Sequence, residues 1–333
     1  MSDIAAAGVR PAWRARPQVA VSQGAPDARR LLQLGLAGIW LLDGVLQYQG
    51  WMFTKGFSDM LAGSASGNPG VIARPITWDA TLVAHHLVLL NSVFATIQLL
   101  LGLGIAWRPT VRPALAASIA WAVAVWWFGE GLGMVLTGDL SPVDGAPGAV
   151  ILYALAAVLL WPADRDTRAP FTAARAVGAP VARALWLVLW LSLAYFALLP
   201  SSRAPQGLHD MVAGMEDGEP GWVAALGRAG AAAVDHRGLA VSIVLAAALV
   251  VIAIGVYLPP PLLRATVILA LVVSGVIWVF GQAFGEIMAG GATDPNSAPL
   301  LALLALCYWP ARSALTPPAP TAAAGPVEGT LAS

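Results

Sequence analysis

Long apolar stretches alternate with short polar connections over most of this chain. Eight stretches are long enough to cross a hydrocarbon core of roughly 30 Å as helices. They lie at residues 32–50, 80–106, 113–137, 146–162, 181–199, 237–258, 264–288 and 297–310. The pattern therefore predicts an all-α integral membrane protein with eight transmembrane helices.

The last four stretches repeat features of the first four. Residues 57–70 (FSDMLAGSASGNPG) and 208–221 (LHDMVAGMEDGEPG) match without gaps at seven of fourteen positions. An offset of 152 aligns Trp126, Phe128, Gly129, Gly133 and Ala146-Pro147 with Trp278, Phe280, Gly281, Gly285 and Ala298-Pro299. The chain is thus predicted to be a tandem duplication of a four-helix unit, with four residues missing in the last span of the second copy. Because each unit has an even number of helices, both copies should have the same orientation.

Charge predicts the orientation and the division of the chain. With the N-terminus inside, thirteen arginines fall on the inner side, and only five lysines and arginines fall outside. This bias predicts a protein of the cell membrane with both termini cytoplasmic. We expect a first repeat at 30–163, a linker at 164–180 and a second repeat at 181–311. Residues 1–29 and 312–333, rich in Ala, Pro and Gly, are expected to be disordered cytoplasmic tails.

Composition supports the membrane class and narrows the partners. Hydrophobic residues make up 58% of the 333 positions and charged residues 11%, which is too apolar for an ordinary soluble domain. The formal net charge of zero gives no reason to expect nucleic acid, so the lipid bilayer is the expected partner. No catalytic triad order, cysteine pair or phosphate loop stands out. The glycines at 129 and 133 are interpreted as small-residue contacts between helices.

Polar residues within the apolar stretches form the candidate site. Asp43 and Gln47 lie near the outer end of the first span, His85 and His86 in the outer part of the second, and Glu130 in that of the third. Ionisable groups at membrane depth are costly and usually mark a functional site. We therefore predict a pocket open to the outer side that could hold a proton, a cation or a quinone headgroup. The alternative is a hydrogen-bonded network that only fixes helix packing.

The second repeat retains only part of this set. His236 corresponds to His85 and Gln282 to Glu130, whereas Asp43 is replaced near Ala194. The chemistry is accordingly expected in the first repeat.

A metal site is a competing interpretation. All four histidines, and every methionine after the initiator, fall in the outer half of the predicted topology. Imidazole and thioether ligands suit copper, with His85, His236, Met60 and Met211 as candidates. His85 and His236 could alternatively be the axial ligands of a b-type haem. The lone Cys307 lies in an apolar stretch and is assigned to packing.

The plan of each half resembles the DoxX-like group of four-helix membrane proteins. The segment IQLLLGLGIAWRPTVRPALA runs from the second span through a basic turn at Arg108-Pro109 into the third. The resemblance covers residues 30–163, and 181–311 more loosely. That group includes the membrane subunit of thiosulfate:quinone oxidoreductase, so it implies a quinone-linked redox or redox-accessory role, with other membrane redox proteins as partners. An outer-face copper or haem protein and a non-catalytic assembly subunit are the alternatives.

Overall fold

Helices make up the framework of the computed structural model, which describes residues 27–165 and 169–311. Within these ranges the only β-structure is an isolated bridge between Phe171 and Pro310. Five helical segments are long and apolar enough to cross a membrane. They are α4 (Leu87–Ala106), α5 (Val111–Phe128) with the turn before it, α8 (Ala179–Phe196), α12 (Gly238–Gly255) and α13 (Pro260–Val276), which continues to Gly281. These helices indicate a multi-pass membrane protein. The predicted tails, apart from residues 27–29, lie outside the described residues.

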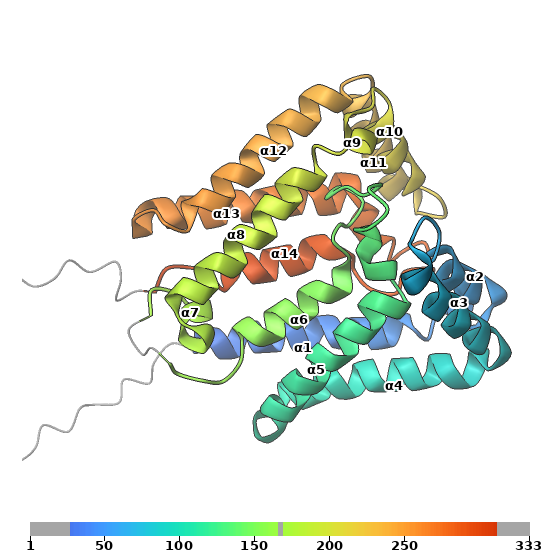
Figure 1. Cartoon of the computed structure of the whole chain (residues 1–333), viewed down its shortest axis with the longest axis horizontal. Coiled ribbons are helices and arrows are strands. Elements are labelled where there is room, and N and C mark those ends of the chain that lie inside the picture. Colours follow the sequence, from blue (N-terminus) through green and yellow to red (C-terminus); the bar gives the residue numbers. More distant parts are fainter. Residues whose placement is uncertain (1–26, 166–168, 312–333) are drawn as a thin grey trace, which may run out of the picture.

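Three further helices complete the bundle. They are α1 (Ala28–Leu46), which carries Arg29, Arg30 and Asp43, and the shorter apolar helices α6 (Ala149–Leu159) and α14 (Ser297–Leu306). In Figure 1, α6 and α14 lie side by side in the middle, with α1, α4 and α5 on one side and α8, α12 and α13 on the other. Residues 28–163, the first half, and 179–311, the second half, therefore meet through their last helices.

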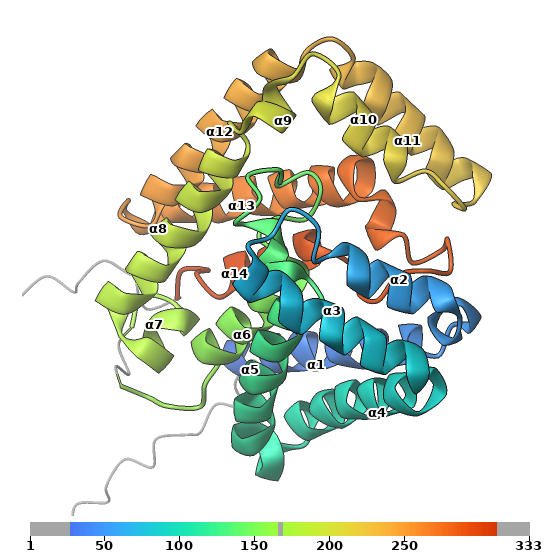
Figure 2. The same ribbon diagram turned by 45° about the vertical axis from the view of Figure 1, so that its right-hand side comes forward.

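Short helices cover one end of this bundle. They form two pairs, α2 (Lys55–Gly63) with α3 (Gly70–His85) and α10 (Gly207–Gly214) with α11 (Gly221–Val234), each preceded by a short turn, η1 (Gly50–Phe53) or α9 (Pro200–Arg203). Both pairs lie at the end of the bundle away from the start of α1 and the end of α14 (Figures 1 and 2). The stretch predicted at 80–106 is thus two helices. His86, with φ −128° and ψ 35°, interrupts the helical backbone between them.

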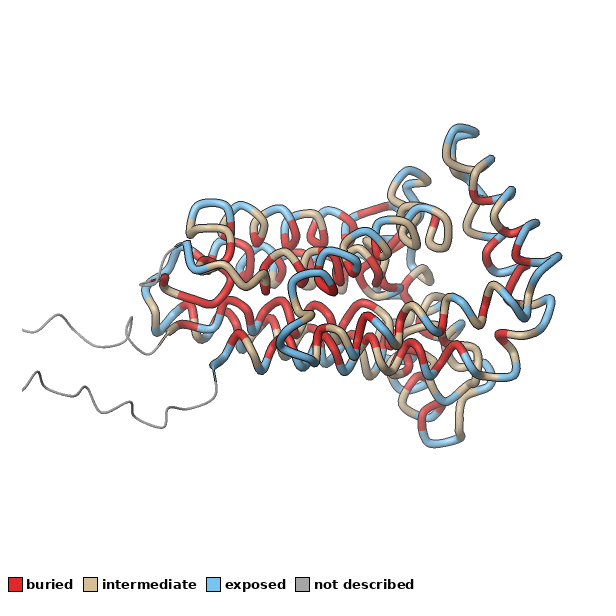
Figure 3. Tube along the Cα trace, turned by 90° about the horizontal axis from the view of Figure 1, so that it is seen from below, coloured by how far each residue is buried: buried red, intermediate tan, exposed pale blue. Residues whose placement is uncertain are grey.

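Burial follows the faces expected for helices in lipid. The inward faces carry large buried rings, among them Trp40 and Tyr153, whose centroids are 4.2 Å apart. The outward faces of the same bundle are apolar yet exposed, as at Val188 (67%) and Val244 (70%) (Figure 3). A large exposed apolar surface marks contact with a membrane or partner. Its position around the bundle agrees with lipid contact.

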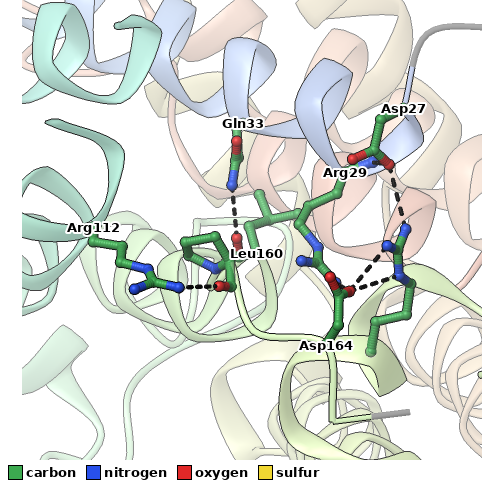
Figure 4. Close-up of polar contacts among 8 residues, drawn as sticks. Asp27, Arg29, Gln33, Arg112, Leu160 and Asp164 are labelled. Atoms are coloured by element: carbon green, nitrogen blue, oxygen red, sulfur yellow. Dashed lines mark hydrogen bonds and ion pairs between the residues drawn. The ribbon is translucent and has the colours of Figure 1, made fainter. Parts of the chain in front are cut away.

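Polar contacts fasten the linker to α1 at the opposite end of the bundle. Arg29 Nη2 lies 2.8 Å from Asp164 Oδ1, and Arg175 Nη2 lies 2.9 Å from the same oxygen (Figure 4). Nearby, Gln33 Nε2 donates to the carbonyl oxygen of Leu160 at 2.9 Å. The hydrogen bond from Arg29 holds the pKa of the Asp164 carboxyl below its usual value. Arg175 belongs to helix α7 (Thr172–Val177), which leads directly into α8.

Candidate functional site

The candidate site begins where the chain turns back after α5. Trp126 Nε1 donates to the carbonyl oxygen of Pro147 at 2.8 Å, and Glu130 Oε1 accepts from the backbone N–H of Val150 at 3.1 Å. Glu130 lies two residues beyond the end of α5, and its carboxyl therefore caps the first turn of α6. Gly133 has φ +61°, and a Cβ on it would lie 1.8 Å from the Pro147 oxygen. Only glycine fits this backbone approach.

The second half repeats these contacts. Trp278 Nε1 donates to the carbonyl oxygen of Pro295 at 3.0 Å, and Gln282 Oε1 accepts from the N–H of Ala298 at 3.2 Å. Gly285, with φ +77°, lies against Pro295 as Gly133 lies against Pro147.

Two sequence interpretations change as a result. Pro295, rather than Pro299, makes the contacts that Pro147 makes, and the loop from Gly285 to Pro295 is four residues shorter than the loop from Gly133 to Pro147. The glycines at 133 and 285 allow a turn to approach a carbonyl and do not mediate contacts between helices. Neither the position of this proline nor the role of these glycines is visible in the sequence, because both depend on contacts between residues far apart in the chain.

A cavity of about 320 Å³ lies beside this turn in the first half. We call it the acidic cavity, because four carboxyl side chains and no lysine, arginine or histidine line it. Its main side chains are Asp43, Asp79, Glu130, Asp294, Gln47, Gln98, Trp40, Phe57, Phe94, Trp121 and Phe128. Pockets of this size, lined largely by apolar and aromatic side chains with a few convergent polar groups, are typical of small-molecule sites.

Several residues that line this cavity have a buried oxygen without a hydrogen-bond partner. Asp43, 2% exposed, accepts from the Tyr153 hydroxyl at 2.5 Å through Oδ2, whereas its Oδ1 is unpartnered. The same holds for the buried side-chain oxygens of Gln47 and Gln98 and for Glu130 Oε2. Unsatisfied buried polar atoms cost free energy and are rare in native proteins. These oxygens can accept hydrogen bonds from a ligand or from water if the lining side chains adjust.

The second half closes the acidic cavity. Asp294 belongs to the loop before α14, where it accepts hydrogen bonds from the Thr293 hydroxyl at 2.9 Å and the Asn296 N–H at 2.8 Å. Burial raises the pKa of this carboxyl. Sequence reasoning missed Asp294 because it lies in a polar loop of the half expected to be inert. The Asp-Pro-Asn sequence at 294–296 signals a turn but gives no hint of its position.

A second cavity of about 240 Å³ adjoins the first, and Glu130 and Asp294 line both. We call it the loop cavity, because residues 139–149 form most of its wall. Asp139 and Asp144 lie there and are exposed. Burial, and then the charge of Asp294, raise the pKa of Glu130 to about 8.

The second half has an apolar counterpart of the acidic cavity. It measures about 350 Å³. Six lining positions recur at the repeat offsets: Phe57, Phe94, Ala124, Val125, Phe128 and Gly129 become Leu208, Leu245, Val276, Ile277, Phe280 and Gly281. The carboxyls do not recur, since Ala194 and Gln282 take the positions of Asp43 and Glu130. Both halves thus have a cavity at these positions, and of the two only the acidic cavity is lined by carboxyls.

The structure brings together three of the five predicted pocket residues. Asp43, Gln47 and Glu130 line the acidic cavity. His85 and His86 do not. Both are exposed where α3 meets α4, and His85 Nδ1 lies 2.7 Å from the Thr81 carbonyl oxygen. They leave the site because residues 70–85 form a covering helix instead of the start of a membrane span.

The histidines are also not assembled into a metal site. His236 is exposed and lies 3.0 Å from Gln206 Nε2 through its Nε2 atom. The α3–α4 and α11–α12 corners that carry His85 and His236 are separate in both ribbon views (Figures 1 and 2). Met60 lines the acidic cavity and Met211 belongs to α10. Across residues 27–165 and 169–311, no group of three or more His, Cys, Asp and Glu side chains is arranged to hold a metal.

Comparison of the chain with protein-family profiles, curated proteins and solved structures gave no significant match.

Proposed function

We propose that this protein is a tandem duplication of a four-helix membrane unit, with eight spans and both termini cytoplasmic. The order of elements supports this proposal, because each half has a first helix, a covering pair, two long helices, a reversing turn and a short last helix. The equivalent turn contacts of Trp126 and Trp278 support it further. We also propose that the unit is DoxX-like, since Arg108–Thr110 forms the expected tight turn between α4 and α5.

Cysteine labelling in intact cells tests this topology. Cys307 is fully buried, so the unmodified chain should give little background with a membrane-impermeant maleimide. We expect Asp59→Cys, on the exposed face of α2, to be labelled from outside. Arg108→Cys, in the α4–α5 turn, should react only after the membrane is permeabilised. Labelling of both variants in intact cells, or of Arg108→Cys alone, would exclude the proposed orientation.

We further propose that the acidic cavity binds the headgroup of a membrane quinone, in a quinone-linked redox or redox-accessory protein. The observation that carries this proposal is a cavity lined by aromatic rings and by carboxyl and amide side chains whose buried oxygens lack hydrogen-bond partners. A quinone is flat and reaches such a site through the bilayer. Its carbonyl oxygens can accept from a protonated carboxyl or an amide N–H, and the hydroxyls of the quinol can donate to carboxyl and amide oxygens. Phe94 and Trp121, whose centroids are 5.7 Å apart, provide rings for packing against it.

Filling the cavity tests this assignment. Ala124 lines the acidic cavity, and Ala124→Phe should lower the quinone content of the purified protein about tenfold, since overpacking costs roughly 1–3 kcal/mol. Val276 is its counterpart in the apolar cavity, and Val276→Phe provides the matched control with unchanged quinone content. If the unmodified protein neither retains quinone nor binds a short-chain quinone, the quinone proposal fails. A non-catalytic assembly subunit would then be the better assignment.

A further inference from the structure

Comparison of Glu130 with Gln282 separates a structural role from a chemical one. Both side chains accept a backbone N–H in the first turn of the following helix, at 3.1 Å from Val150 and 3.2 Å from Ala298. Gln282 performs this capping as an amide, with its Nε2 atom donating to Ser297 Oγ at 3.0 Å. Capping therefore does not require a carboxyl at this position. What Glu130 adds to the first half is an exchangeable proton.

The second carboxyl oxygen of Glu130 lies at the junction of the two cavities. Oε1 is held by Val150, a lining residue of the acidic cavity. Oε2 is buried, has no hydrogen-bond partner, and lies where a Cβ on Gly148 would approach within 2.2 Å. Gly148 lines the loop cavity. The free oxygen is thus fixed on the loop-cavity side while its carboxyl also faces the acidic cavity.

Titratable groups lie on both sides of this junction. On the side of the acidic cavity are Asp43 and its partner Tyr153. Asp294 lines both cavities beside Glu130, and Asp139 and Asp144 line the loop cavity at its exposed end. No lysine, arginine or histidine lines either cavity, so no fixed cation holds these carboxyls permanently ionised. The loop cavity is polar and large enough for ordered water between them.

We infer that Glu130 and Asp294 pass protons between the acidic cavity and the aqueous phase on the side of the covering helices, through the loop cavity. The step moves one proton and no electrons. The O–H bond on Glu130 Oε2 breaks as an O–H bond forms on Asp294 or on water, and the reverse transfer restores it. The inference deepens the proposed function, because reduction or oxidation of a quinone needs protons, but the route itself does not depend on the ligand's identity.

Infrared spectroscopy of the purified full-length protein at pH 6 tests the route. We expect a protonated-carboxyl band that is absent in Glu130→Gln and that shifts within the mixing time in D2O. Ser141→Phe, which fills the loop cavity, should slow this shift on the order of tenfold or more. Asp294→Asn should also slow it while keeping an acceptor for the Asn296 N–H. Asp59→Asn is the control, since Asp59 is exposed on α2 and lines neither cavity.

Distinct results would overturn the inference. The absence of a band specific to Glu130 would show that this carboxyl is not the proton carrier. Exchange as fast in Ser141→Phe and Asp294→Asn as in the unmodified protein would exclude the loop cavity as the path. If Ser141→Phe does not fold, comparison of Asp294→Asn with Asp59→Asn decides the question. Quinone content is measured on the same samples, so a protein without quinone but with the expected exchange would refute the ligand alone.

Discussion

Replacement of Gly133 by alanine should disrupt the turn that positions Glu130. The new Cβ would lie 1.8 Å from the Pro147 carbonyl oxygen, which is 1.2 Å short of the 3.0 Å below which real Cβ atoms are essentially never found. The positive φ adds roughly 1–2 kcal/mol for any residue with a Cβ. Because the obstacle is backbone rather than a mobile side chain, the chain must move. We expect a total cost of about 4 kcal/mol or more, in the range of the most damaging point substitutions.

Gly138 provides the matched control for this prediction. It has φ +75°, but a Cβ there would meet nothing within 4 Å, so Gly138→Ala should lose only about 1 kcal/mol. Thermal unfolding in detergent, followed by circular dichroism, should show midpoints lowered by roughly 8 °C or more for Gly133→Ala and about 2 °C for Gly138→Ala. Equal losses for the two variants would refute the close approach of Gly133 to Pro147 and, with it, the account of how α6 is placed.

Three further results are expected. Tyr153→Phe removes the hydroxyl that donates to the buried Asp43 carboxyl, so stability should fall by about 2 kcal/mol; an unchanged unfolding midpoint would show that the bond contributes nothing. Gln282→Leu should cost about 1–2 kcal/mol through loss of the cap on α14, whereas Gln282→Glu, which keeps the acceptor, should cost less; equal midpoints would contradict the capping role. Because the pKa of Asp164 is lowered by Arg29, this pair stabilises the folded state above about pH 4 and ceases to do so as pH falls through the lowered pKa. The difference in midpoint between the unmodified protein and Arg29→Met should therefore be full at pH 7 and shrink in acid, and a difference that grows in acid would reverse the assigned sign.

Hydropathy alone located the helices of the bundle, because burial in lipid requires continuous apolar segments whatever their packing. Hydropathy predicted less well where these helices end. The stretch at 113–137 reads as one span, yet α5 ends at Phe128 and the next residues turn back. The turn depends on Pro147 accepting a hydrogen bond from Trp126, a contact across 21 residues that no local pattern contains.

The sequence also predicted the polar residues of the first half. Asp43, Gln47 and Glu130 stand out because placing a polar side chain in an apolar stretch costs free energy and usually marks a functional site. Their convergence on one cavity, the exclusion of His85, and the entry of Asp294 from the other half were decided by tertiary structure. The physical reason is that residue type sets the free-energy cost of burying a side chain. Which buried groups face the same space is decided only by the packing of distant segments. The sequence shows a glutamate at position 130 and a glutamine at position 282. The difference could be interpreted only once the structure showed that both side chains cap the following helix.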